Sequence, residues 1–138
     1  MLPPIKRSTA CLHILGDELV PEKISELLGC MPTYSVAKGG VVVAQDTGRR
    51  HLARTGRWSL KAPDPDPRNL DKQIDEILGQ LKGDVDIWQA LGSRYDISMF
   101  CGIFMIDSHE SVNISPSCLA ELGKRGMKLT FDIYGPEK

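Results

Sequence analysis

The fold of this chain is decided near its C-terminal end by residues 127–134, which read MKLTFDIY. Apolar and polar residues alternate along this stretch, and a period of two predicts a strand with one buried and one exposed face. We expect the apolar residues to face a layer of helices and the polar ones to project from the opposite, helix-free face of a sheet. The apolar set is Met127, Leu129, Phe131 and Ile133, and the polar set is Lys128, Thr130, Asp132 and Tyr134.

The residues before this strand predict a helix. Ser115 can cap its first free backbone N–H groups, and Pro116 occupies the first turn, where no donor is needed. Leu119 and Leu122 are expected to face the core. Gly126 is expected to end the helix in a left-handed conformation, which a side chain would disfavour.

The rest of the chain follows from the same kinds of pattern. Asn69 provides a cap for a longer central helix, and residues 61–69 form a proline-rich internal connector, because each proline disfavours helix at the residue before it. Predicted strands cover 9–15, about 56–61, 95–106 and 127–134, and predicted helices cover 21–28, 70–82, 84–91 and 116–125.

This order, βαβααβ(β)αβ, predicts an α+β fold related to ferredoxin-like arrangements. We expect one domain over residues 1–138, with a mostly antiparallel sheet and helices packed on one face. The alternative is a mixed sheet in which residues 41–44 add a further strand, and the same segment also fits a loop anchored by its valines.

The composition is that of an ordinary globular protein, with 41% hydrophobic and 25% charged residues in 138. Because 17 basic residues face 18 acidic ones, no global field attracts nucleic acid or an anionic membrane. The first apolar run ends at Leu15, too short for a signal sequence, and no stretch approaches membrane-spanning length. The four cysteines are far apart without a CxxC pair, which predicts reduced thiols and a cytoplasmic protein.

For each residue pattern that could indicate a catalytic, metal or cofactor site, a purely structural role is the better interpretation. Cys11 and His13 point the same way on a strand, yet no second Cys/His pair completes a metal site. Cys101 lies in an apolar strand, where desolvation penalises a thiolate, even with His51 or His109 as a base. The glycines form no phosphate-binding loop. We therefore expect no metal and no cofactor.

The most distinctive local feature is a basic loop over residues 49–57, with four arginines and a histidine in nine residues. Arginine matches carboxylates and phosphates, so the loop suits an anionic ligand or an acidic protein surface, although a solvated loop is the simpler interpretation. Nucleic acid is disfavoured, since interleaved aromatics are missing. The candidate site adds the nearby Lys38 and Trp58 and two strand residues, giving Lys38, Arg49, Arg50, Arg54, Arg57, Trp58, Asp132 and Tyr134.

Two members of this set carry open alternatives. Trp58 stands at the mouth of a strand, where it either seals the core edge or stacks on a ligand. Asp132 and Tyr134 are hypothesised to form a small polar site with an arginine of the basic loop. Their sheet face is also a surface on which a partner or a second copy of the chain could dock.

Several short motifs, in their order and spacing, carry a resemblance that runs nearly end to end. They are Gly16-Asp17, Pro21, Leu28-Gly29, Pro32-Thr33, Lys38-Gly39, TGRWSL at 55–60, Cys101-Gly102 and LTFDIY at 129–134. In these the chain resembles a family of small bacterial proteins known as domain of unknown function 4279. The resemblance implies one standalone α+β domain and no established reaction, cofactor or catalytic residue. The chain departs from the family in its valine run after Gly39 and in Val20, where a capping aspartate is typical.

The sequence therefore favours a non-enzymatic binding or protein-interaction module whose partner is an unidentified protein or a small anionic ligand. The rival is a small enzyme or ligand-binding domain whose polar site combines Lys38, Arg54, Trp58, Asp132 and Tyr134. A concave pocket of roughly 300 Å³ or more with convergent polar groups would favour the rival, and a flat exposed patch the interaction module.

Overall fold

The computed structural model describes residues 5–63 and 69–136. Most of the proline-rich connector, residues 64–68, therefore lies outside the described residues. In chain order the elements are β1 (Ile5–Gly16), α1 (Pro21–Leu28), β2 (Tyr34–Val36), β3 (Val41–Val43), β4 (Arg50–Leu52), β5 (Gly56–Lys61), α2 (Leu70–Leu78), α3 (Val85–Gly92), β6 (Asp96–Met105), α4 (Pro116–Lys124) and β7 (Lys128–Tyr134).

The main sheet of the described residues has five strands in the order β2-β5-β1-β6-β7. The long strand β1 is central and pairs antiparallel with both β5 and β6, so that Leu12 lies opposite Leu60 on one side and Met99 on the other. The last pair, β6 with β7, is parallel, because α4 carries the chain back across the sheet before β7 begins. The prediction of an α+β domain with a mostly antiparallel sheet is confirmed.

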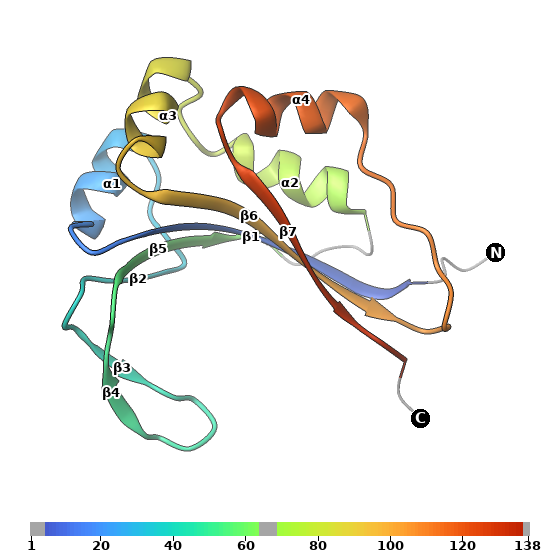
Figure 1. Ribbon diagram of the computed structural model, residues 1–138, viewed down its shortest axis with the longest axis horizontal. Coiled ribbons are helices and arrows are strands. Elements are labelled where there is room, and N and C mark those ends of the chain that lie inside the picture. The colour runs from blue at the N-terminus through green and yellow to red at the C-terminus, as the bar shows by residue number, and fades with distance from the viewer. Residues whose placement is uncertain (1–4, 64–68, 137–138) are drawn as a thin grey trace.

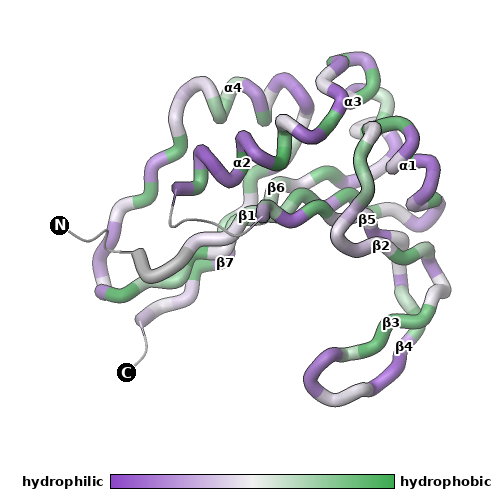
Figure 2. Tube along the Cα trace, turned by 180° about the vertical axis from the view of Figure 1, so that it is seen from behind, coloured by the Kyte–Doolittle hydropathy of each residue, from purple (hydrophilic) through white to green (hydrophobic). Residues whose placement is uncertain are grey.

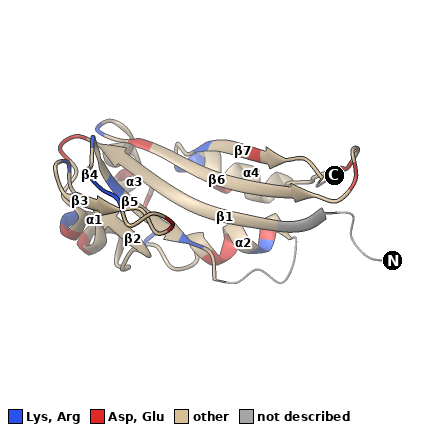
Figure 3. Ribbon diagram, turned by 90° about the horizontal axis from the view of Figure 1, so that it is seen from below, with Lys and Arg blue, Asp and Glu red and all other residues tan. Residues whose placement is uncertain are grey.

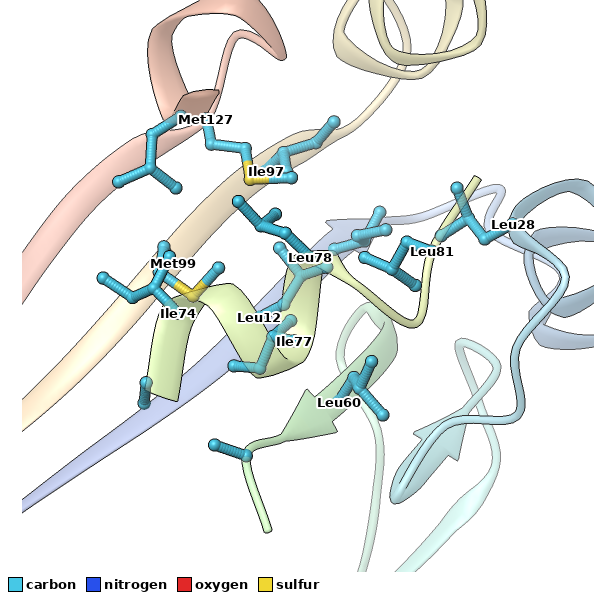
Figure 4. Packing of buried hydrophobic residues seen from close by; sticks show 14 of the residues in the cluster. Leu12, Leu28, Leu60, Ile74, Ile77, Leu78, Leu81, Ile97, Met99 and Met127 are labelled. Atoms are coloured by element: carbon cyan, nitrogen blue, oxygen red, sulfur yellow. The ribbon is translucent and has the colours of Figure 1, made fainter. Parts of the chain in front are cut away.

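All four helices of the described chain lie on the same face of this sheet (Figure 1). They cover inward-facing residues of the central strands, including the fully buried Leu12 and Met99. Figure 4 shows how Ile74 and Ile77 of α2 reach down onto these strand residues. Within residues 5–63 and 69–136, no helix covers the other sheet face, as the sequence predicted.

Local signals explain where the helices begin and end. The side chain of Asn69 accepts a hydrogen bond from the N–H of Lys72, and that of Ser115 accepts one from Cys118, so both predicted caps are confirmed. Gly126 adopts φ 68°, which lets the N–H of Met127 bond the Leu122 carbonyl and close α4.

Residues 41–43 form a strand, but not one of the main sheet. They pair antiparallel with β4 in a separate two-stranded hairpin. Two short strands, β2 and β4, were not predicted, because three residues are too few for a recognisable alternation. Helix α2 ends at Leu78 rather than at residue 82, and a turn carries the chain on to α3.

The apolar residues of β7 are less buried than the sequence predicts. Phe131 pairs with Cys101 and Ile133 with Ile103, so both side chains do point to the helix side. They are nevertheless 41% and 61% exposed, because β7 is an edge strand that extends past the helical layer (Figure 1). Leu119, predicted to face the core from α4, is also exposed, whereas Leu122 is buried.

Candidate functional site

The helix-free face of the sheet carries side chains that strand pairing brings into rows. His13 lies between Ser59 on β5 and Ser98 on β6, and its Nδ1 is 2.7 Å from the Ser59 hydroxyl oxygen. The ring of His13 also meets the edge of Phe100 at 5.7 Å between centroids. This face is therefore partly polar and partly aromatic, and Ser59 on it is buried.

The β3–β4 hairpin projects from one end of the sheet on the side away from the helices (Figure 1). The N–H of Gly39 bonds the Ala53 carbonyl and the N–H of Ala53 bonds the Gly40 carbonyl, which ties the base of the hairpin together. Figure 2 shows hydrophobic residues along β3 and hydrophilic ones in the turn and at the start of β4, where Arg50 and His51 precede Leu52. The predicted basic loop, residues 49–57, is therefore not one loop: it includes strand β4, the segment that follows it and the start of β5.

Strand alternation divides the hairpin into two faces. Val42 and His51 are paired and line a hollow toward the sheet. The pairs Val41 with Leu52 and Val43 with Arg50 point the opposite way. That outer face is strongly exposed, at 58% for Val41, 52% for Val43 and 64% for Leu52.

The hollow between the hairpin and the edge of the sheet has a volume of about 430 Å³. It combines cationic, aromatic, hydroxyl and aliphatic side chains from β2, β3, β4, β5 and the segment before β5. Its lining residues are Tyr34, Val36, Val42, His51, Ala53, Arg54, Thr55 and Arg57. Gly56 begins β5 beside the hollow and lets that strand end lie close to β1, since a Cβ on it would lie 2.7 Å from the carbonyl oxygen of Gly16.

The charge of the hollow is positive and largely uncompensated. No carboxylate of the described residues lies within 4 Å of the guanidinium groups of Arg54 or Arg57. Burial and the nearby Arg57 lower the pKa of His13, which places the field of this arginine over the sheet face. Figure 3 shows lysine and arginine at this end of the sheet, around β4 and β5.

The carboxylate of Asp17 lies close to Thr55 of the hollow's lining. Asp17 forms an exposed ion pair with Lys38, with Nζ and Oδ2 3.4 Å apart. A hydrogen bond from Thr55, which itself lines the hollow, is the main cause that lowers the pKa of Asp17, followed by Lys38. Lys38 is therefore already partnered and does not line the hollow.

The structure brings together only part of the predicted site. Arg54 and Arg57 meet at the hollow, whereas Arg49 and Arg50 do not line it. Arg50 is exposed on the outer hairpin face, and Arg49 is exposed at the end of the turn.

Trp58 belongs to the core, so its interpretation as a ligand-stacking residue is corrected. Its side chain is fully buried on the helix side of β5, and its Nε1 donates a hydrogen bond to the Ser25 hydroxyl of α1 at 3.0 Å. A buried ring offers no face to a ligand. Trp58 instead joins the sheet to the first helix.

The hypothesis that Asp132 and Tyr134 join an arginine of the basic loop is also wrong. Both residues lie on β7, and β6 and β1 separate this strand from β5. Tyr134 donates a hydrogen bond to Asp132 at 2.5 Å and stacks on Phe104 with ring centroids 4.7 Å apart. These side chains form a separate small cluster at the far edge of the sheet.

Sequence reasoning missed Tyr34, Val36 and Val42 as lining residues. Tyr34 and Val36 lie on a strand of three residues, too short to show which way its side chains point. In the sequence Val42 is one residue of a valine run, and its inward direction depends on pairing with His51. No local pattern encodes such long-range pairing.

Other chemistry is limited among the described residues. His13 and Ser59 resemble a base and a nucleophile, but the other described contact of the His13 ring is with Phe100, not with an orienting carboxylate. No group of three metal-ligating side chains gathers in the described chain. None of the helices in the described part has the length and apolar character needed to cross a membrane.

A second hollow of similar volume, about 430 Å³, lies beside α1. Glu22 and Glu26 contribute to its lining, together with Cys30 and Met31, and the described lining residues include no lysine or arginine. Its charge is therefore opposite to that of the hollow beside the hairpin.

The family model described as domain of unknown function (DUF4279) matches residues 6–136, nearly the whole chain. The chain therefore belongs to this family. No curated protein and no solved structure matches it.

Proposed function

We propose that this chain is a non-enzymatic binding domain that holds a small anionic ligand in the hollow beside the hairpin. The observation that carries the proposal is the pair Arg54 and Arg57 lining a hollow of about 430 Å³ without a carboxylate partner among the described residues. This volume falls within the usual range for small-ligand sites.

The lining residues suit a ligand with a carboxylate or phosphate group. Each guanidinium offers several N–H donors in a planar fork that matches two anionic oxygens at once. Tyr34, His51 and Thr55 add polar side chains around the same space, while Val36 and Val42 provide an apolar wall for the rest of the ligand.

Binding rather than catalysis is favoured by the chemistry of the available nucleophiles. Burial raises the pKa of Cys101 to about 12 and that of Cys118 to about 11, so both thiols stay protonated and inert near neutral pH. The His13–Ser59 pair lies on the sheet face, and no carboxylate of the described residues orients the His13 ring. The described lining of the hollow has cations and hydroxyls but no carboxylate.

The test is a thermal-shift screen with inorganic phosphate, nucleotides and small carboxylates. A ligand at a hundred times its dissociation constant stabilises the folded protein by about 2.7 kcal/mol, which gives a clear rise in Tm. The shift should shrink as added salt shortens the screening length to about 8 Å at physiological ionic strength.

Arginine variants provide the matched control. Replacing Arg54 and Arg57 by glutamine should abolish the shift and leave the Tm of the unliganded protein nearly unchanged, since both residues are exposed. Arg50→Gln removes an equally exposed arginine from the outer hairpin face and should leave the shift intact. Binding that survives the double substitution, or that Arg50→Gln alone removes, contradicts the proposed site.

A second candidate function is protein interaction through the outer hairpin face. It is favoured by the exposure of Val41, Val43 and Leu52 beside Arg50, a combination suited to an acidic partner with apolar anchors. Leu52→Asp should then reduce capture of a partner from native lysate, while the Arg54/Arg57 double variant should capture it normally. The reverse pattern would assign the interaction to the hollow.

A further inference from the structure

Strand β7 forms one border of the main sheet, and no strand of the described residues pairs with its outer edge. β6 is its only strand neighbour in the described chain, and the described backbone hydrogen bonds outside the helices and sheets include none to β7. Figure 3, seen from the helix-free side, shows β7 as the outermost strand. We propose that two copies of this chain associate by pairing their β7 strands antiparallel, which joins two sheets into one.

The edge lacks most of the devices that prevent such pairing. β7 spans seven residues and contains neither proline nor glycine. Natural sheets commonly shield edges with short strands, prolines, bulges or several lysines. The opposite border has this protection, because β2 is only three residues long and the chain then turns into the hairpin. On β7, Phe131 and Ile133 remain exposed toward the helix side.

The sequence of β7 is complementary to itself in one antiparallel register. With Thr130 on the two-fold axis, residues whose numbers sum to 260 lie opposite each other. Lys128 of each copy then faces Asp132 of the other, and Leu129 faces Phe131. A two-fold interface repeats each contact, which gives two opposite-charge pairs on one face and two apolar pairs on the other.

The contacts that Lys128 and Asp132 make within one chain leave both side chains able to pair with a second copy. Lys128 has an ion pair with Asp96 at 3.4 Å, and both side chains are largely exposed, so the pair contributes little. Asp132 accepts a hydrogen bond from Tyr134 and keeps further lone pairs for a lysine. Pairing with a second copy would also satisfy the outward N–H and C=O groups of β7 and cover Phe131.

The test is the solution mass measured by size-exclusion chromatography with light scattering. The wild-type protein should have twice the 15.2 kDa mass of the chain. Lys128→Asp places aspartate against aspartate at both pairs, and Asp132→Lys places lysine against lysine, so each variant alone should be monomeric.

Mixing the two variants tests the register itself. A Lys128→Asp chain and an Asp132→Lys chain restore opposite charges at both pairs, so the mixture should form a heterodimer, detectable by a tag on one variant. Lys23→Asp, a reversal at an exposed lysine of α1, should remain dimeric. A monomeric wild type, dimeric single variants, or a mixture that stays monomeric overturns the proposal. Circular dichroism spectra matching the wild type establish that each variant is folded.

Discussion

The hydroxyl of Ser8 donates a hydrogen bond to Oε1 of Gln73 at 3.0 Å, and Nε2 of Gln73 donates one to the Ser8 carbonyl at 2.9 Å. Both residues are buried, and they lie 65 positions apart in the sequence. The two bonds join the central strand β1 to α2 inside an otherwise apolar layer. They set the position of the helix over the sheet more narrowly than contacts between aliphatic side chains do.

Removing one partner of this pair should be costly. Ser8→Ala leaves Oε1 of Gln73 without its buried donor, and we expect a loss of about 1–3 kcal/mol in the free energy of unfolding, measured by urea denaturation. Adding Gln73→Leu removes the unpaired Oε1 and should recover the part of the loss that comes from it, although the Ser8 carbonyl then loses its donor Nε2. A double variant whose loss equals the sum of the two single losses would show that the pair is not coupled.

Because β7 lies at the sheet edge, truncating its apolar side chains should reduce the free energy of unfolding less than truncating those of β6. Met99→Ala removes a fully buried side chain and should cost about 2–5 kcal/mol. Phe131→Ala should cost only about 1–2 kcal/mol, because the phenylalanine is already 41% exposed. Urea midpoints at unchanged slope would measure both. A Phe131→Ala loss as large as that of Met99→Ala would place Phe131 in the core.

The lowered pKa of His13 predicts a loss of stability in mild acid. Burial, with a smaller contribution from Arg57, disfavours the imidazolium in the folded protein, while the unfolded chain titrates near about 6.5. The unfolded state therefore binds the proton first, and stability should fall as the pH drops below about 6.5 until the folded-state pKa is passed.

A histidine variant isolates this effect. The free energy of unfolding of His13→Gln should change less between about pH 6.5 and 5 than that of the wild type. Asp17 and Glu121 also have lowered pKa values, but such carboxyl groups act in more acid solution, below about pH 4. Identical slopes for variant and wild type would remove His13 as the cause.

Thiol reactivity should divide the four cysteines into two pairs. Cys101 and Cys118 are buried and have pKa values raised to about 12 and about 11, whereas Cys11 and Cys30 are partly exposed. Ellman's reagent at about pH 8 should therefore titrate two thiols in the folded protein and four in guanidinium chloride. Cys30→Ser should reduce both counts by one, and Cys101→Ser only the second. Four reactive thiols in the folded protein would contradict the buried positions.

Only some of the residues that line the hollow can be predicted from the sequence. The clustering of arginines in the sequence predicts Arg54 and Arg57, but sequence proximity also groups Trp58 with them although it faces the other side of β5. Tyr34 lines the same hollow and was missed, since its place depends on pairing with Ser59 twenty-five residues later. Side-chain direction at a strand end depends on register, which a short segment does not reveal.

The sequence by itself determined the elements that local physics controls. The caps at Asn69 and Ser115, the left-handed Gly126 and the alternation of β7 were readable because each depends on neighbours within a few residues. Only the tertiary structure decided the parallel pairing of β6 with β7, the hairpin made by residues 41–52, and the distance between Asp132 and the arginines. Those features follow from contacts between segments far apart in the chain. The free energy of such contacts depends on the whole core, so no single segment of the sequence determines them.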